Sequence, residues 1–228
     1  MFVGESEMGT FQKGDDVVFK LVLGFDGRPQ AKRVQLVARG AAPDNMNIIS
    51  VTNGNQEYNA PLHFHDLVVV PNCICALDDR IIFSSLRDEL QWTARLHNSH
   101  FRGLNPRISQ VYRQVVDAAC QYFRLELAHE CINYYPDAAH WRPYHRDNYV
   151  ANENCTVILS FGSPRVLSFR HQERRVYKHI PQRNGMLLYF AEGVNNVWVH
   201  GIDPLNAPGH SGGRISISLW GTAGLQAY

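Results

Sequence analysis

The spacing of apolar and polar residues divides this chain into three regions. Residues 16–38 alternate in the manner of strands on either side of "FDGRPQ", a glycine-containing reversal, and predict a β-hairpin. Residues 38–61 are rich in Asn, Gly, Ala and Pro without a regular period, which indicates a linker or an irregular crossing segment. From about residue 77 the apolar positions follow first a helical and then a strand-like spacing.

Two helices are predicted where the spacing is helical. Residues 77–92 begin with acidic side chains near an N-cap, and Ile81, Leu86 and Leu90 fall roughly on one face. Residues 105–125 form a second amphipathic segment. Its expected buried face consists of Ile108, Val111, Val115, Ala118 and Tyr122.

After Leu125 the chain consists of short apolar runs separated by Pro and Gly. The runs predicted to be strands are residues 129–136, 155–162, 165–171, 175–181, 185–191, 196–202 and 214–222. Helices followed by many short strands predict an α+β chain that is mainly β, with a β-sandwich or jelly-roll core and helices packed outside it.

Composition and charge narrow the class of protein. At 228 residues, with 45% hydrophobic and 19% charged residues, the chain is long enough for one catalytic core. Its net charge of +1 gives no overall field that recruits nucleic acid or an anionic membrane, so such binding needs a local basic patch. Residues 170–178, "RHQERRVYK", are a candidate for that patch, although a solvated hairpin is the commoner reading.

The compartment is predicted from what the sequence lacks. The apolar runs are too short and interrupted to span a bilayer, and the residues after Met1 lack the features of a secretory signal. Five cysteines, an odd number in a chain that is large enough to fold without disulfides, predict reduced thiols. We therefore expect a soluble intracellular protein.

The segment "YHRDNYV", residues 144–150, places His145 and Asp147 two residues apart in a strand-like neighbourhood. In a strand, residues i and i+2 point the same way, so both would project from one face. A buried carboxylate is costly unless a cation offsets it, whereas an incidental surface pair needs no metal. His200, in the apolar run "NNVWVHGI", would complete two histidines and one carboxylate, the facial triad of non-haem Fe(II) oxygenases.

A cation follows these three residues on the next predicted strand. The segment "GGRISISLW" contains Arg214 and, on the same face, Ser216. Iron enzymes that use 2-oxoglutarate need a cation for the distal carboxylate of this cosubstrate, and arginine suits that bidentate contact. The order HxD, then His, then RxS on short strands favours a metal site over a surface pair.

The segments "CINYYPDAAHWRPYHRD", "WVHGI" and "RISIS" resemble the AlkB-like branch of the Fe(II)/2-oxoglutarate-dependent dioxygenases. The resemblance covers roughly residues 66–222 and implies a double-stranded β-helix, a jelly-roll core, in a domain at 66–228. It also implies an enzyme that uses Fe(II), 2-oxoglutarate and O₂. It assigns the catalytic metal to His145, Asp147 and His200, and 2-oxoglutarate to Asn133, Tyr135, Arg214 and Ser216.

One position departs from the pattern of the DNA-repair members of this branch. They carry a second arginine six residues after the first, where this chain has Trp220. That arginine serves the nucleobase side of the pocket, so its replacement weakens an inference of alkylated-base repair. The aromatic residues that would line the substrate mouth, or simply pack in the core, are Trp141, Tyr144, Tyr149 and Trp220.

For the substrate, the resemblance implies hydroxylation or oxidative demethylation of a modified nucleic acid, such as methylated RNA or single-stranded DNA. A protein side-chain or small-molecule hydroxylase is an alternative, which the near-zero net charge and Trp220 favour. A non-catalytic nucleic-acid-binding protein with a retained metal site is another. The sequence does not predict an oligomeric state.

Residues 1–38 resemble the end of a cold-shock domain. "KGDDVVFKLVLGFDGRPQAKRV" is similar to the last two strands of that five-stranded OB barrel, and Phe2 and Val3 match the end of its second RNA-binding motif. The earlier strands, which carry the aromatic platform, are absent. The resemblance implies a partial cold-shock segment at 1–38 and single-stranded nucleic acid as a partner. A β-hairpin that packs on the catalytic core is the alternative for this segment. Residues 39–65, by their composition, are expected to form a linker or an irregular crossing segment.

Two rival signals are weaker. "HFHD", residues 63–66, contains metal-ligating residue types, but no third partner is evident. "GHSGG", residues 209–213, matches the G-x-S-x-G of serine hydrolases, which requires a helix after the serine and a histidine later in the chain. Here a predicted strand follows and no histidine lies beyond His210, so we read this segment as a glycine loop.

Overall fold

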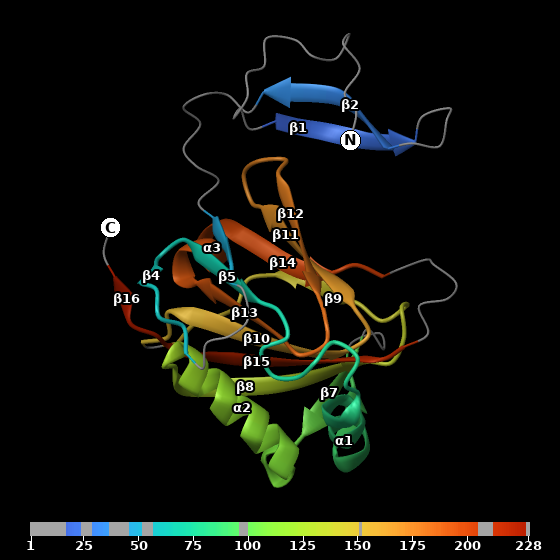
Figure 1. Ribbon diagram of the computed structural model, residues 1–228, viewed down its shortest axis with the longest axis vertical. Coiled ribbons are helices and arrows are strands. Elements are labelled where there is room, and N and C mark those ends of the chain that lie inside the picture. The colour runs from blue at the N-terminus through green and yellow to red at the C-terminus, as the bar shows by residue number, and fades with distance from the viewer. Residues whose placement is uncertain are drawn as a thin grey trace. The chain divides into compact units, whose positions relative to one another are not determined.

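Figure 1 shows a computed structural model of the chain, which divides into two units, Met1–Asp44 and Asn45–Tyr228. The residues that the structure describes are 17–23, 29–36, 46–51, 57–95, 100–150, 152–204 and 212–226. In the first unit, β1 (Val17–Leu23) and β2 (Pro29–Leu36) pair antiparallel, which confirms the predicted hairpin. The turn between them and the cold-shock-like residues before Val17 lie outside the described residues.

The second unit contains a large sheet of eight strands and a small sheet of four. The large sheet has the order β3 (Asn47–Ser50), β5 (Asp66–Val70), β13 (Met186–Ala191), β10 (Cys155–Gly162), β15 (Arg214–Thr222), β8 (Glu126–Tyr135), β7 (Phe101–Leu104) and β6 (Gln91–Ala94). The small sheet has the order β12 (Tyr177–Gln182), β11 (Arg165–His171), β14 (Trp198–Ile202) and β9 (Arg142–His145). Neighbouring strands are antiparallel except β3 and β5. A separate parallel pair joins β4 (Leu62–His63) to β16 (Leu225–Gln226).

Two helices, α1 (Ile81–Glu89) and α2 (Gln110–Phe123), cover one face of the large sheet (Figure 1). A short 3₁₀ turn, Pro106–Ile108, precedes α2, and α3 (Glu192–Val197) connects β13 to β14. In the described part of the chain, no helix combines the length and the apolar character that crossing a membrane requires.

The buried apolar side chains form two clusters, one on each face of the large sheet. The first lies between this sheet and the helices and includes Leu86 and Leu159. The second lies between the two sheets and includes Phe169, Phe190 and Trp198. Every residue of β10 and β13 is buried, because both faces of these central strands are covered, and they therefore appear in the sequence as continuous apolar runs. These three layers confirm a mainly β jelly roll with flanking helices.

The predicted strands agree best with the structure in the core. Residues 155–162, 165–171 and 214–222 form β10, β11 and β15 with the predicted bounds. The sequence patterns did not predict α3 or the strands β3, β4, β5, β6, β7 and β16. Residues 47–50 of β3 fall within the segment expected to be a linker, and the strand is mostly exposed, so it lacks the apolar alternation that marks a strand.

The predicted helix faces were partly wrong. Ile81 is 74% exposed, and α1 instead buries Phe83 and Leu86. Ile108 was predicted on the buried face of the second helix, but it is 66% exposed because it lies before α2. The N-cap of α2 is Ser109, whose side chain accepts a hydrogen bond from the Tyr112 backbone N–H. The helix therefore begins after Ile108, and its buried face is Tyr112, Val115, Val116, Ala119, Tyr122 and Phe123, with Ala118 exposed.

Gly185, between β12 and β13, is expected not to tolerate a side chain. Its φ is +72°, and a Cβ atom there would lie 2.1 Å from the backbone oxygen of Cys75. Gly185→Ala should lower the free energy of unfolding in urea by about 2–4 kcal/mol, through a left-handed backbone and an overpacked contact together. Gly224→Ala is the control, because nothing lies within 4 Å of its added carbon. Equal stability of the two variants would contradict this account.

Candidate metal centre

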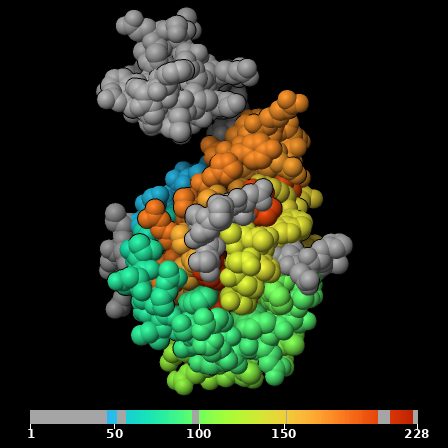
Figure 2. All heavy atoms as spheres, turned by 90° about the vertical axis from the view of Figure 1, so that its right-hand side faces the viewer, coloured from blue at the N-terminus to red at the C-terminus, as the bar shows by residue number. Residues whose placement is uncertain are grey.

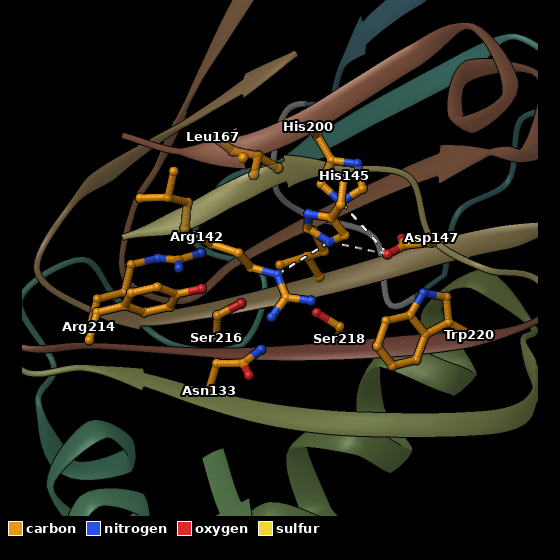
Figure 3. A pocket seen from close by; sticks show the side chains of 14 residues that line it. Asn133, Arg142, His145, Asp147, Leu167, His200, Arg214, Ser216, Ser218 and Trp220 are labelled. Atoms are coloured by element: carbon orange, nitrogen blue, oxygen red, sulfur yellow. Dashed lines mark hydrogen bonds and ion pairs between the residues drawn. The ribbon is translucent and has the colours of Figure 1, made fainter. Parts of the chain in front are cut away.

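Strand pairing brings the two predicted histidine ligands together. His145 is the last residue of β9 and His200 lies within β14, and the two are direct partners across this antiparallel pair. Their ring centroids lie 4.5 Å apart. Both side chains line the cavity that Figure 3 shows between the two sheets.

Asp147 lies two residues beyond the end of β9, so strand alternation alone does not place it. The Asn195 side chain of α3 accepts a hydrogen bond from the Asp147 backbone N–H and donates one to the Asp147 carbonyl, both at 2.9 Å. On β10, Thr156 Oγ1 donates to Asp147 Oδ2 at 2.8 Å, and Tyr149 OH lies 2.8 Å from the same hydroxyl. These contacts fix the carboxylate with Oδ1 toward the imidazoles.

The three side chains fit a divalent ion. Asp147 Oδ1 lies 3.6 Å from His145 Nε2 and 3.8 Å from His200 Nε2, which is longer than a hydrogen bond. Atoms that bind one ion at about 2.0–2.2 Å lie about 3–4 Å from each other. Among the described residues, no other group of three or more potential metal ligands has its ligand atoms this close together, within 4.8 Å of one another.

Burial sets the charge state of these ligands. It lowers the pKa of His200 to about 4, and it lowers the pKa of His145, where the Arg142 guanidinium adds to the effect. Burial alone would raise the pKa of Asp147, but the two imidazoles and the Thr156 hydroxyl outweigh it and hold this pKa below its usual value. Two neutral imidazoles and one carboxylate are a donor set that suits ferrous iron.

The other end of the same cavity holds a buried guanidinium (Figure 3). Arg214, the first residue of β15, is paired with Tyr135 of β8. Its Nη2 donates to Ser160 Oγ at 2.8 Å, while Nε and Nη1 are buried without a hydrogen-bond partner in the part of the chain that the structure describes. Burial lowers the pKa of Arg214 to about 10, so the group stays charged at neutral pH. A buried cation with two unsatisfied donors fits a carboxylate.

Strands β15 and β8 supply one wall of the cavity. Alternation along β15 directs Arg214, Ser216, Ser218 and Trp220 into it, and Asn133 of β8 is the cross-strand partner of Ser216. The space between these walls measures about 380 Å³ when its opening to solvent is included. All seven residues predicted to hold the metal and 2-oxoglutarate line this cavity, as Trp220 does.

Arg142 also lines the cavity, although no sequence signal marked it. Its Nε donates to His145 Nε2 at 3.2 Å, and its Nη1 lies 3.2 Å from His100 Nε2. Residues three apart on a regular strand point to opposite faces. The pairing of β9 with β14 is irregular between His200 and Ile202, which lets Arg142 and His145 face the same side. An ion that binds His145 Nε2 has to displace this guanidinium.

The other aromatic residues predicted at the substrate mouth lie outside the cavity lining. Tyr149 contacts Thr156, as described above, and the Tyr144 hydroxyl donates to Asp203 at 2.9 Å. Trp141 does not line the cavity either. A role for these three residues in substrate binding stays a prediction.

The rival cluster at residues 63–66 has a structural explanation. The buried Asp66 carboxylate accepts hydrogen bonds from the His63 backbone N–H at 2.8 Å and from Asn47 Nδ2 at 2.9 Å. These contacts tie β3 to β5 and satisfy the carboxylate without a metal. Most of the glycine loop at 209–213 lies outside the described residues.

One family model and two solved structures are similar to this chain. Residues 81–219 match the family model described as the 2OG-Fe(II) oxygenase superfamily. No curated protein matches the chain. A Pseudomonas putida prolyl-4-hydroxylase structure is similar, with 16% identity and a TM-score of 0.43 over 64% of this chain and 86% of that one. The structure of OsALKBH1 is similar with 13% identity and a TM-score of 0.47, over 72% of this chain and 99% of that one.

Proposed function

The chain belongs to the 2OG-Fe(II) oxygenase superfamily, and we propose that it is an AlkB-like member whose iron is held by His145, Asp147 and His200. As a member of this superfamily it is a dioxygenase that uses Fe(II), 2-oxoglutarate and O₂. The assignment of residues depends on one observation. Three ligand atoms converge within 4.8 Å in the same cavity that contains the unsatisfied donors of Arg214.

The Arg214 end of the cavity is the proposed site for 2-oxoglutarate. The Nε and Nη1 donors of Arg214 suit its distal carboxylate, and Ser216 lies on the same face of β15. Asn133 and Tyr135, from the neighbouring strand β8, complete the polar lining. These residues would hold the distal carboxylate at this end of the cavity, which would leave the 2-oxo acid group to face the metal ligands.

When bound, Fe(II) supplies the redox chemistry that couples decarboxylation of 2-oxoglutarate to succinate with insertion of one oxygen atom of O₂ into a substrate C–H bond. The chain itself holds and orients the reacting groups. Ile158, Leu167 and Ile202 line the cavity on its apolar side and restrict the access of water to the reacting centre.

For the substrate we propose a modified nucleic acid, such as methylated RNA or single-stranded DNA. The AlkB-like motifs around the three ligands support this proposal. Trp220 lies near Asp147 in Figure 3 and offers an indole face on which a planar base can pack. A protein side chain or a small molecule is the alternative, because Trp220 replaces the arginine of the repair members and the net charge is only +1.

Mass spectrometry after incubation with iron, ascorbate and 2-oxoglutarate tests the substrate. Methylated RNA and DNA strands and histone-type peptides would be compared in one panel. Loss of a methyl group from a nucleic-acid strand, with release of formaldehyde, is the expected result. Hydroxylation confined to peptides would overturn the nucleic-acid proposal and leave the dioxygenase chemistry intact.

Asn195 is expected to strengthen metal binding without touching the metal, because it holds the Asp147 backbone on both sides. Asn195→Ala should weaken Mn²⁺ binding, measured by electron paramagnetic resonance, by about 10–100-fold. The matched control is Asn196→Ala, since the Asn196 side chain is exposed. Identical Mn²⁺ affinities in the two variants would remove Asn195 from the proposed support of the site.

A further inference from the structure

The outer face of the small sheet carries aromatic and basic side chains that the catalytic cavity does not use. Strand β11 alternates between the two faces, since Leu167 lines the cavity and Phe169 packs in the core, whereas Arg170 is exposed. Tyr177 of β12 is the direct cross-strand partner of Arg170. This face is therefore the reverse side of the sheet that carries His200.

Two rings of β12 lie nearly parallel there. Tyr177 is 50% exposed and His179 is exposed, and their ring planes are 13° from parallel with centroids 6.2 Å apart. Ser168 Oγ on β11 lies 2.9 Å from His179 Nδ1 and holds that ring in place. Rings fixed in this orientation lose little conformational freedom when another planar group stacks on them.

A third ring lies across the same face, on β9. The Arg170 guanidinium lies 5.1 Å from the centre of the Tyr144 ring, and the Tyr144 hydroxyl donates to Asp203. Between them, Gly201 of β14 has no side chain, and a Cβ atom there would lie 3.0 Å from the Tyr144 backbone nitrogen. The missing side chain lets the Tyr144 strand approach closely. We call Tyr144, Arg170, Tyr177 and His179 the outer platform.

Positive charge is concentrated beside the platform. The β11–β12 hairpin, residues 170–178, projects from the surface of the second unit (Figure 2, orange). It contains two exposed arginines at its tip, Arg174 and Arg175, in addition to Arg170 and Lys178. Glu173 is the one acidic residue of this segment. In a chain whose net charge is +1, this is a local excess of cations. It is complementary to a polyanion.

We propose that the outer platform binds single-stranded nucleic acid. Exposed rings on a sheet accept unpaired bases by stacking, and nearby arginines meet the phosphates. A double helix keeps its bases paired and stacked inside, so it offers no free base faces to these rings. The platform goes beyond the proposed function, because it lies on the opposite side of the sheet from the cavity and needs neither iron nor turnover. Tyr144 and His145 are consecutive, so a bound strand would pass next to the catalytic segment.

The test is fluorescence anisotropy of a short labelled uridine-rich RNA with the full chain in the absence of iron. Tyr177→Ala should weaken binding by about 5–150-fold, the range for loss of one base–aromatic stack. Tyr177→Phe keeps the ring and should bind like the wild type. Circular dichroism of each variant checks that it is folded.

The charge contribution is tested separately with two arginines. Arg170→Ala should lower the slope of log affinity against log salt by about 0.7, the value for one phosphate contact with a single strand. The matched control is Arg87→Ala, an exposed arginine of α1 that pairs with Asp88. This control should leave both affinity and slope unchanged.

Three results would overturn the outer platform. The first is that the wild type does not bind the single strand. The second is that the Tyr177→Ala and Arg87→Ala variants bind it with equal affinity. The third is that the wild type binds an RNA duplex as tightly as the single strand. Because the assay uses no iron, its failure is distinguishable from failure of the substrate proposal. Strands that bind but are never oxidised would support the platform and contradict the proposed substrate.

Discussion

The Asp147→Asn variant is expected to form almost no succinate from 2-oxoglutarate. Asp147 is the single anion among the three proposed ligands, and its replacement leaves two neutral imidazoles. The amide keeps the shape of the side chain, its oxygen can still accept from Thr156, and Asn195 holds only the backbone. The fold should therefore persist while iron binding fails. We expect turnover to fall by more than about 100-fold, beyond the range seen for residues that only support a ligand.

Succinate release with iron and ascorbate measures this loss, and Mn²⁺ binding shows whether its cause is the metal. Asp117→Asn, an exposed carboxylate of α2, removes the same charge elsewhere and is the control. His145→Ala should behave as Asp147→Asn does. Wild-type succinate formation by either ligand variant would contradict the assignment of the metal centre.

The second large effect is expected from a comparison of two buried arginines. Arg165 donates to the carbonyls of Asp137, His140 and Asp203, at 3.1, 2.9 and 2.8 Å. Arg214 donates to Ser160, and its guanidinium lies 5.4 Å from the centre of the Tyr135 ring. Two of its donors, Nε and Nη1, have no hydrogen-bond acceptor among the described residues. Backbone carbonyls thus accept hydrogen bonds from Arg165, whereas two donors of Arg214 have no acceptor among the described residues. We therefore expect Arg165 to stabilise the fold, and we propose that Arg214 binds the cosubstrate.

Arg214→Met should weaken 2-oxoglutarate binding by at least about 30-fold, equivalent to about 2 kcal/mol for loss of a buried charge-assisted pair. Its free energy of unfolding should stay the same or rise, because an uncompensated buried charge is removed. Arg165→Met should do the reverse. It should leave cosubstrate binding intact and cost about 3 kcal/mol of stability, since three carbonyls lose a charged donor.

Calorimetric titration with 2-oxoglutarate in the presence of Mn²⁺ measures the first quantity, and urea denaturation of the metal-free protein measures the second. The same thermal stabilisation by 2-oxoglutarate in wild type and Arg214→Met would contradict the proposed cosubstrate site. Loss of stability in Arg214→Met equal to that in Arg165→Met would show that Arg214 is mainly structural.

The order of residues along the chain predicted the features of this protein that depend on local geometry. Alternation is a steric property of the strand itself, so the pattern from Arg214 to Trp220 predicted correctly that Arg214 and Ser216 share a face. The bounds of β10, β11 and β15 followed from apolar runs between Pro and Gly residues. The spacing of His145 and Asp147, with His200 later in the chain, identified the three residues that the fold brings together.

Tertiary structure alone decided the contacts that depend on residues far apart in the chain. Asp147 lies beyond its strand, so its aim is set by Asn195 and Thr156 rather than by alternation. Arg142 enters the cavity through an irregular pairing of β9 with β14, which no local pattern encodes. The sequence likewise does not distinguish Arg165 from Arg214, because the carbonyls that satisfy a guanidinium are brought to it only by packing of the sheets.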